Sequence, residues 1–572
     1  MFTRRAGSTA SASSLRLLAL LLALGLVAAA CGGDDDEPES ADGETEGGLV
    51  TDTTRPPEEV EGEPQQGGSI TVGLEAETSG WRPATGTWAS SGFNVAYTLF
   101  DPLMSLTEDG STVVPYLAES LEPNDDATEF TLTLRPDVTF HDGTPLDAQA
   151  IKDNFDIYLK ADTSNQKGVL ADVTSFDVTG ELTGVYKLSR PNVSFPDLLT
   201  GVPGMPFSPT AAKELGDAFS DNPVGAGPYQ FVSWARDDQL VVERYEDYWG
   251  TPGYLDEITF QPIPDEDSRL QSLLSGDIDA FTTLRQSIIG QALDAEEQGT
   301  IKATVFAGNN GGGAIFNTLT PPVDDQRVRQ GLAHGIEQAD LVEVLGGADI
   351  SPLQTQFFSN KSPFYSEKVA EGFPTYDPDK ARSLLDEYVN DPERSDGKAP
   401  GSPIAVEYNC TAIPSLQEQA QAVQAYWQAV GVEVTLNAVE QSVHIQNAIT
   451  DQYMINCWRQ GGDEDPSIVL GNAFGEPETQ VLNFTNYHND EVAGILDTLR
   501  STDDEDERAA ALEELGLLFA EDVPNTWTGG NNEFIATRPE VSGVDTWKLP
   551  DGSTGDGAQG GITVWGQVWL AE

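Results

Sequence analysis

The sequence is poor in the residues that hold metals and in those that neutralise anions. Among 572 residues there are 3 Cys and 4 His, and neither a Cys-x-x-Cys nor a His-Glu-x-x-His pattern occurs. We therefore expect no zinc site, no haem and no other cofactor. Basic side chains number 30 against 94 acidic ones, which gives a formal net charge of −64. Such a charge repels polyanions, so nucleic acid is excluded as a partner.

Apolar residues are plentiful enough to build folded cores. They make up 38% of the chain, and 10 Trp, 15 Tyr and 23 Phe are among the residues present. This content excludes global disorder. The length exceeds what one hydrophobic core supports, so several domains or a two-lobed body are expected. The acidic residues are spread along the chain, which is typical of a solvated, salt-tolerant surface.

The first thirty residues have the layout of an export signal. Arg4, Arg5 and Arg16 precede an apolar run, Leu17–Ala30, and small residues lead up to Cys31. This run is shorter than the roughly 20 apolar residues that a membrane-spanning helix needs. Small residues directly before a cysteine resemble a bacterial lipobox, which implies a lipoprotein signal peptide over residues 1–30 and a lipid on Cys31. An ordinary signal cleavage is the alternative, and either Sec or twin-arginine export fits.

A low-complexity segment follows. Residues 32–66 contain no aromatic side chain and many Asp, Glu, Gly and Pro. Because such a segment cannot offset its ordering entropy by apolar burial, we expect residues 31–66 to be a disordered acidic tether. With a lipid on Cys31, the tether would hold an extracytoplasmic body at the outer face of the cell membrane. No later apolar stretch has spanning length, so the rest of the chain is expected outside the bilayer.

From residue 67 onward, strand-like and helix-like patterns are mixed. Alternating apolar and polar side chains predict strands at 67–74, 130–134 and 229–232. Apolar side chains three or four residues apart predict helices over 328–336, 416–430 and 509–518. No repeat of fixed period occurs. The body is therefore predicted to be an α/β or α+β fold.

Several runs in this part of the chain, taken in order, resemble extracytoplasmic solute-binding protein family 5, the binding proteins of peptide- and nickel-type ABC importers. The most recognisable is Val138–Leu146, which reads Val-Thr-Phe-His-Asp-Gly-Thr-Pro-Leu. Others are Val114–Leu121, Asn222–Tyr229, Ser275–Asp279 and Tyr376–Ala381. Each run is weak alone, but their order and spacing are specific.

The same runs also have local structural explanations. Asp142-Gly143 is typical of a turn, and His141 is then expected to be packed or to cap that turn. Gly276 follows a short helical segment, where a left-handed residue is needed. Asp325 is placed to cap the helix predicted after it.

The resemblance implies an α/β, two-lobed, periplasmic-binding-protein-like fold of type II, with an extra subdomain in the first lobe. The first lobe would contain residues 67–110, 222–305 and 521–572, the extra subdomain residues 111–221, and the second lobe residues 306–520. Closure of the lobes would then remove a ligand from water.

Ligand contacts are expected on loops at strand ends. By resemblance, the candidates are Trp81, Trp88, Thr282, Thr283, Phe316, Asn317, Trp458, Arg459, Asp463 and Trp527. Aromatic faces would cover apolar groups and a guanidinium would grip a carboxylate. Core packing is the alternative for any single Trp, and Trp427 on its helical stripe is expected in the core. Trp458 and Arg459 follow a strand-like run, 453–457, and are predicted to line the cleft.

One departure from the family bears on the ligand. Peptide-binding members carry an Asp three residues after the Trp of this loop, where it pairs with the peptide ammonium. Here that position is Gly461, and Asp463 is the nearest substitute. A peptide is favoured by the resemblance and weakened by this residue. A saccharide or another polar metabolite is the alternative, and nickel is disfavoured because no His cluster is visible.

The predicted function is therefore capture of a small ligand, peptide-like by preference, and its delivery to the permease subunits of an ABC importer. The protein is expected to be a monomer without catalytic activity. A ligand-sensing receptor of the same fold is one alternative. An exported hydrolase is another, although no Gly-x-Ser-x-Gly motif occurs.

Cys410 and Cys457 are expected at the ends of strand-like runs in the second lobe. Export permits a disulfide between them, and two buried thiols are the alternative.

Overall fold

The computed structural model describes residues 62–572 except positions 109, 111, 162, 163, 165, 348–350, 352, 359, 361, 363, 462–464, 545, 556, 560, 561 and 572. The predicted signal peptide, Cys31, nearly all of the predicted tether and Asp463 lie outside the described residues.

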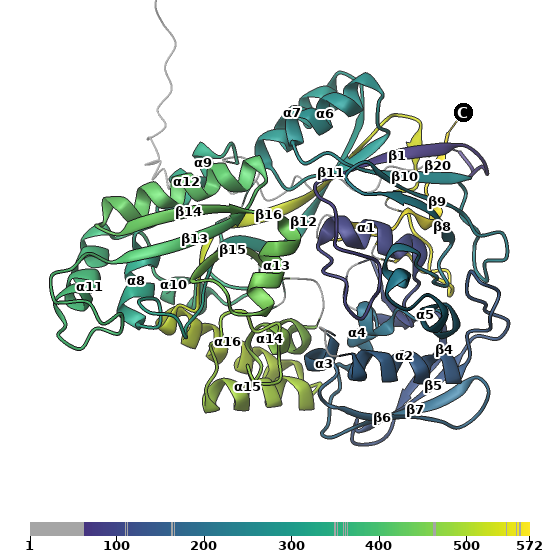
Figure 1. Cartoon of the computed structure of the whole chain (residues 1–572), viewed down its shortest axis with the longest axis horizontal. Coiled ribbons are helices and arrows are strands. Elements are labelled where there is room, and N and C mark those ends of the chain that lie inside the picture. Colours follow the sequence, from purple (N-terminus) through teal and green to yellow (C-terminus); the bar gives the residue numbers. More distant parts are fainter. Residues whose placement is uncertain are drawn as a thin grey trace, which may run out of the picture. The chain divides into compact units, whose positions relative to one another are not determined.

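A ten-stranded mixed sheet forms the framework of the described chain (Figure 1). In order across the sheet, the strands are β14 (Glu433–Val439), β13 (Ala405–Thr411), β15 (Ile455–Gly461), β12 (Lys302–Phe316), β16 (Asn525–Thr537), β11 (Ala280–Thr282), β1 (Ser69–Leu74), β10 (Glu257–Pro262), β9 (Gln239–Arg244) and β8 (Tyr229–Ala235).

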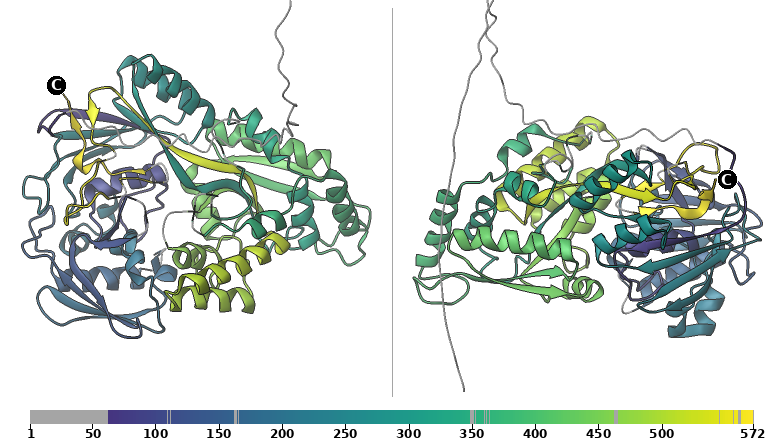
Figure 2. Two further views of the ribbon diagram at one scale, coloured as in Figure 1. Left: turned by 180° about the vertical axis from the view of Figure 1, so that it is seen from behind. Right: turned by 90° about the horizontal axis from the view of Figure 1, so that it is seen from above.

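Two long antiparallel strands, β12 and β16, belong to both halves of this sheet. At one end β16 pairs with β11 through Phe281 and Ala536, and at the other β12 pairs with β15 through Ala314 and Cys457. Figures 1 and 2 show the pair crossing from one lobe to the other. The predicted two-lobed α/β architecture is therefore present.

The two ends of these strands pack in different hydrophobic cores, and each core belongs to a different lobe. On β12, Val305 packs with Phe534 in one core, whereas Phe316 packs with Val523 in another. Val523 and Trp527 both lie in cores of the second lobe, so the chain crosses back to the first lobe along β16, several residues after 521.

The first lobe carries a separate four-stranded sheet within the predicted extra subdomain. Its order is β4 (Ala118–Pro123), β5 (Glu129–Leu134), β7 (Thr183–Leu188) and β6 (Val173–Val178). The helices of this lobe are α1 (Ser90–Leu99), α2 (Ala148–Lys160), α3 (Gln166–Val169), α4 (Phe195–Leu198), α5 (Pro209–Leu215), α6 (Glu266–Ser275) and α7 (Gln286–Glu297). Short strands pair as β2 (Met104–Leu106) with β3 (Val113–Pro115), β17 (Val541–Ser542) with β20 (Trp569–Leu570), and β18 (Ala558–Gln559) with β19 (Ile562–Thr563).

The second lobe is mainly helical around its part of the sheet. Its helices are α8 (Gln326–His334), α9 (Gln338–Val344), α10 (Glu367–Gly372), α11 (Pro378–Asn390), α12 (Pro414–Ala429), α13 (Gln441–Ile449), α14 (Pro466–Phe474), α15 (Asp490–Ser501) and α16 (Glu505–Asp522). The stripe predicted on α12 is buried, and Trp427 lies fully in the core as expected. The apolar stripe predicted on α16 is only partly confirmed. Ala509 is exposed, and its neighbour Arg508 is buried instead and pairs with Asp465 at 2.5 Å.

Local predictions from turn and cap residues are confirmed. Asp325 caps α8 by accepting a hydrogen bond from the backbone N–H of Arg327. Gly276 ends α6 at φ 83°, and Gly143 turns at φ 76°, both in the left-handed region that glycine tolerates. His141 is packed beside that turn, with Nε2 3.0 Å from the carbonyl oxygen of Gly227.

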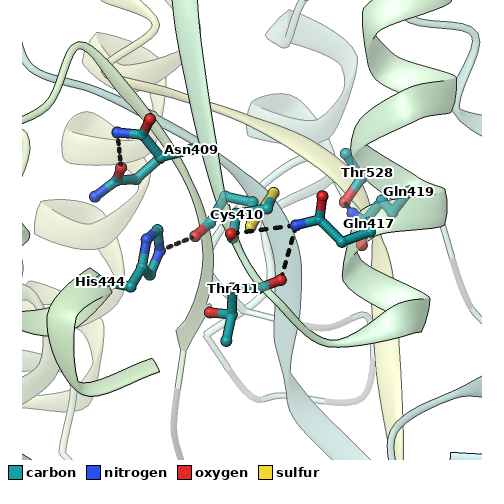
Figure 3. The surroundings of a disulfide bond; sticks show 9 residues. Asn409, Cys410, Thr411, Gln417, Gln419, His444 and Thr528 are labelled. Carbon is teal, nitrogen blue, oxygen red and sulfur yellow. Dashed lines mark hydrogen bonds between the residues drawn. A yellow bond between two sulfur atoms is a disulfide. The ribbon is translucent and has the colours of Figure 1, made fainter. Parts of the chain in front are cut away.

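A disulfide joins neighbouring strands of the second lobe. β13 and β15 run parallel with Asn409 opposite Asn456, so the next pair in register is Cys410 and Cys457. Their sulfurs are bonded and their Cα atoms lie 5.1 Å apart. Figure 3 shows His444 beside the bond on one side and Gln417, which donates to the Cys410 carbonyl at 3.2 Å, on the other.

Candidate functional site

The two lobes meet where strands of each lobe end. Glu75 directly follows β1, and Arg459 lies near the end of β15. Arg459 Nη2 is 2.9 Å from Glu75 Oε1, with the two side chains 28% and 13% exposed. The carboxyl ends of strands in open α/β sheets are where ligands usually bind. This contact therefore marks the candidate site.

Glu75 is held as a carboxylate at this position. Burial alone would raise its pKa, but the charges of Arg459 and Arg269 and the hydrogen bond from Arg459 keep the pKa below its ordinary value. Gln441, the first residue of α13, adds a longer contact of 3.5 Å to the same carboxylate oxygen. Two residues of the second lobe thus converge on one carboxylate of the first.

A buried charged pair on α6 lies behind Glu75. Arg269 Nη2 is 3.7 Å from Glu266 Oε1, and both side chains are almost fully buried. Thr283, just after β11, donates to Glu266 Oε1 at 3.1 Å. Burial raises the pKa of Glu266 and lowers that of Arg269, and the opposite charge of each partner opposes the shift. The first lobe therefore presents a charge network rather than a single acid.

Other charged side chains also bridge the lobes, and one of them, Arg285, lies 4.0 Å from Oε2 of Glu266. Arg285 contacts Glu418 of α12 at 3.1 Å and Asp267 of its own lobe at 3.0 Å. In the extra subdomain, Arg190 contacts Asp497 of α15 at 2.8 Å. Each exposed pair is worth about 1 kcal/mol or less, so none alone holds the lobes together.

The family model described as "Bacterial extracellular solute-binding proteins, family 5 Middle" matches residues 112–480. The chain belongs to this family.

Relatives and solved structures agree with this assignment. The dipeptide-binding protein of Escherichia coli K12 is 23% identical over 504 residues, which is 82% of this chain and 90% of that protein. The periplasmic binding protein DppA from Helicobacter pylori, in complex with peptide STSA, matches with a TM-score of 0.79 and 18% identity over 89% of this chain and 99% of that one. AgaA from A. tumefaciens R10, in complex with agropinic acid, matches with a TM-score of 0.77 and 23% identity. The match covers 88% of this chain and 99% of that one. At these identities the solved structures show the shared two-lobed fold.

In this family 5 protein, Trp458 and Arg459 point to opposite faces of β15, because successive strand residues alternate. Arg459 faces the first lobe through Glu75. Trp458 is half-buried and stacks on His444 of α13, with ring centroids 5.3 Å apart, and meets the edge of Phe484 at 4.8 Å. Trp458 therefore supports α13, whose first residue contacts Glu75.

Two further tryptophans predicted to contact the ligand pack in or against the core of the first lobe: Trp81 is buried and Trp88 is half-buried. Trp81 is buried against Trp234 at 5.7 Å, and Trp88 stacks on Phe100 at 6.0 Å. Both rings belong to the packing of the first lobe. We therefore leave Trp81 and Trp88 out of the candidate site.

Three predicted residues of the second lobe also lie apart from the Glu75–Arg459 contact. Phe316 is fully buried in a core, and Trp527 is enclosed with Phe357 at 5.3 Å. The Asn317 amide donates to the Tyr453 carbonyl at 3.1 Å and so orders the segment that leads into β15. These side chains are committed to packing or backbone contacts. They are likewise left out.

The predicted residues that lie in or beside the charge network are Thr282, Thr283 and Arg459. Thr282 ends β11 and is half-buried, and Thr283 contacts Glu266. Four residues of the network were not among the predicted ones: Glu75, Glu266, Arg269 and Gln441. A signal was present on α6: Glu266 and Arg269 lie three residues apart on the side that also carries Leu270 and Leu273, which are buried.

The described residues also bear on membranes and metals. Within the described ranges, no helix has both the length and the apolar character needed to cross a bilayer. The same residues contain no group of three or more His, Cys, Asp or Glu side chains placed to hold a metal ion. The family is an extracellular, solute-binding component of ABC transporters.

Proposed function

We propose that the chain captures a short peptide or a peptide-like solute between its lobes and delivers it to the permease subunits of an ABC importer. Family membership supports the transport role, and relatives named as dipeptide- and peptide-binding proteins support the ligand class. The observation that carries the proposal is the Glu75–Arg459 contact, in which the end of a strand of each lobe supplies a charged group at one place.

The arrangement suits reversible capture. Charged groups of both lobes become desolvated when the lobes meet, which strengthens their interactions with a polar solute. Capture also needs no covalent step, and we propose that the protein is a binding protein and not an enzyme. It is further proposed to act as a monomer.

Native mass spectrometry of the purified protein tests this function. We expect a mass increment of a small solute that disappears on denaturation, and equilibrium binding of that solute without product. Turnover of a peptide or a glycoside would instead favour an exported hydrolase. Co-purification with a sensor protein and without permease subunits would favour a ligand-sensing receptor.

Replacing Arg459 by Ala is expected to weaken binding of the co-purified solute about thirtyfold, equivalent to about 2 kcal/mol, because a central polar anchor is lost. Calorimetry beside a thermal melt measures both affinity and stability. Trp458→Ala should mainly lower the melting temperature, because the ring packs on His444 and Phe484.

Arg382→Ala is the matched control for this prediction. Arg382 pairs with Asp379 on the surface of α11, and its side chain is 48% exposed. Its loss should leave affinity and melting temperature nearly unchanged. Equal affinities for Arg459→Ala and Arg382→Ala would remove Arg459 from the site.

We also propose that Cys31 is lipidated and that the mature protein is anchored to the outer face of the cell membrane. The lipobox-like run before Cys31 supports this. Cys31→Ser should release the folded protein into the soluble extracytoplasmic fraction or the medium, as measured by cell fractionation and immunoblotting. Normal retention of the variant in the membrane fraction would contradict lipid anchoring.

A further inference from the structure

Two arginines, one from each lobe, act on Glu75. Arg459 of the second lobe binds it at 2.9 Å, and Arg269 of its own lobe packs over Gly73, two residues before Glu75 on the same strand face. We propose that Glu75 switches from Arg459 to Arg269 when a ligand binds, which frees Arg459 for a carboxylate of the ligand and makes the site selective for solutes that carry a free carboxylate. This inference rests on the proposed function.

Arg269 has unused hydrogen-bonding capacity. Its side chain is fully buried, and Nη1 donates to the Ile263 carbonyl at 3.2 Å. Within the described part of the chain, Nε and Nη2 have no hydrogen-bond partner, although Nη2 is 3.7 Å from Glu266. Buried donors are normally satisfied, so two open donors beside a carboxylate constitute a second binding position for it.

The local backbone gives Arg269 access to Glu75. A Cβ atom at Gly73 would lie 3.0 Å from Cγ of Arg269 and 3.3 Å from its Cδ, so the side chain passes over a position that has no side chain of its own. Glu75 is two residues further along the chain. The charge of Arg269 already lowers the pKa of Glu75, which indicates that the two groups interact.

The exchange leaves each carboxylate close to a guanidinium. Before it, Glu75 pairs with Arg459. After it, the ligand carboxylate pairs with Arg459, and Glu75 shares Arg269 with Glu266, whose Oε2 also lies 4.0 Å from Nε of Arg285. Arg459 suits this role because a guanidinium binds a carboxylate through two parallel N–H donors and stays charged. A solute without a carboxylate leaves the Glu75–Arg459 pair in place and gains no such contact.

The crystal structure of the Arg459→Ala variant tests the switch without any ligand. We expect the Glu75 carboxylate about 3 Å from Nε or Nη2 of Arg269. A Glu75 side chain that turns to solvent, with the Arg269 donors still unpaired, would overturn the switch.

Selectivity is measured with trialanine and its C-terminal amide as probes. The unmodified protein should prefer the acid by about tenfold or more, and Arg459→Ala should abolish that preference. Glu75→Gln should tighten binding of the acid and leave the amide unchanged, because Arg459 is then free. Arg190→Ala, which loses another contact between the lobes, should keep the preference. Equal binding of acid and amide would overturn the selectivity.

If neither probe binds, the peptide proposal fails, and the structure of Arg459→Ala alone decides the switch.

Discussion

Replacing Asp101 by Asn is expected to stabilise the protein above pH 7, by up to about 4 kcal/mol. Asp101 follows α1 and is 3% exposed. Its Oδ2 accepts hydrogen bonds from Tyr248 Oη at 2.7 Å and from Trp249 Nε1 at 2.9 Å. Burial raises its pKa to about 7, and the two neutral donors offset only part of that shift. An asparagine oxygen can accept the same two hydrogen bonds without carrying charge.

The direction follows from proton binding. The folded protein holds a proton on Asp101 between about pH 4 and pH 7, whereas the unfolded chain has lost it, so this residue makes the protein less stable as the pH rises through that window. The free energy of unfolding of the Asn variant lacks this pH dependence. The variant should therefore exceed the unmodified protein in stability by almost nothing at pH 4 and by most at pH 8.

Denaturant unfolding of both proteins from pH 4 to pH 8.5 measures the difference directly. Asp101→Ala is the control: it lacks the same ionisable group but leaves the Tyr248 and Trp249 donors without an acceptor, so it should be less stable than Asp101→Asn by the same amount at every pH. A difference between Asn and Asp that does not change with pH would show that Asp101 is ionised throughout.

Loss of the Cys410–Cys457 disulfide is expected to lower the free energy of unfolding by about 4 kcal/mol, on the loop-entropy model for the 47-residue separation. The double variant Cys410→Ser/Cys457→Ser, compared with the oxidised protein by denaturant unfolding, gives the value. The matched variant with Ala at both positions separates the loss of the bond from the burial of two hydroxyls. An unreduced, denatured protein in which both cysteines react with a thiol label would contradict the bond.

Cys457, one end of this disulfide, directly precedes Trp458 and Arg459 on β15. Loss of the bond should therefore also weaken ligand binding, by releasing the strand that carries Arg459 from β13. Affinity measured at a temperature where the variant is fully folded separates this effect from instability.

The features that sequence could predict are governed by nearby residues. The alternation that predicted a strand at 67–74 corresponds to β1, which starts two residues later. Asp325 and Gly276 cap helices as expected because each cap depends on only a few adjacent residues. Trp427 was identifiable as core because its stripe repeats with helical spacing. The two-lobed fold followed from the ordered series of motifs.

The site depends on contacts that no local pattern contains. Glu75 and Arg459 are 384 residues apart, and among 94 acidic side chains nothing in the sequence distinguishes Glu75. The disulfide stayed an open alternative because it depends on the register of β13 against β15. Phe316 and Trp527 lie on long strands that continue through the cores, so closeness to an expected cleft did not indicate exposure.

The strands β12 and β16 join the two lobes, so we expect the lobes to turn about this pair, which then acts as a fulcrum. Arg459 lies opposite Gly312 of β12, close to this fulcrum, whereas Arg190 and Asp497 belong to the extra subdomain and α15 at the far end of both lobes (Figures 1 and 2). A rotation about the pair moves each group through an arc proportional to its distance from the fulcrum. We therefore expect a small rotation to separate Arg190 from Asp497 while Glu75 stays within reach of Arg459. Solute would then enter from the far end, and the last contact to break on full opening would be the one that we propose the ligand exchanges.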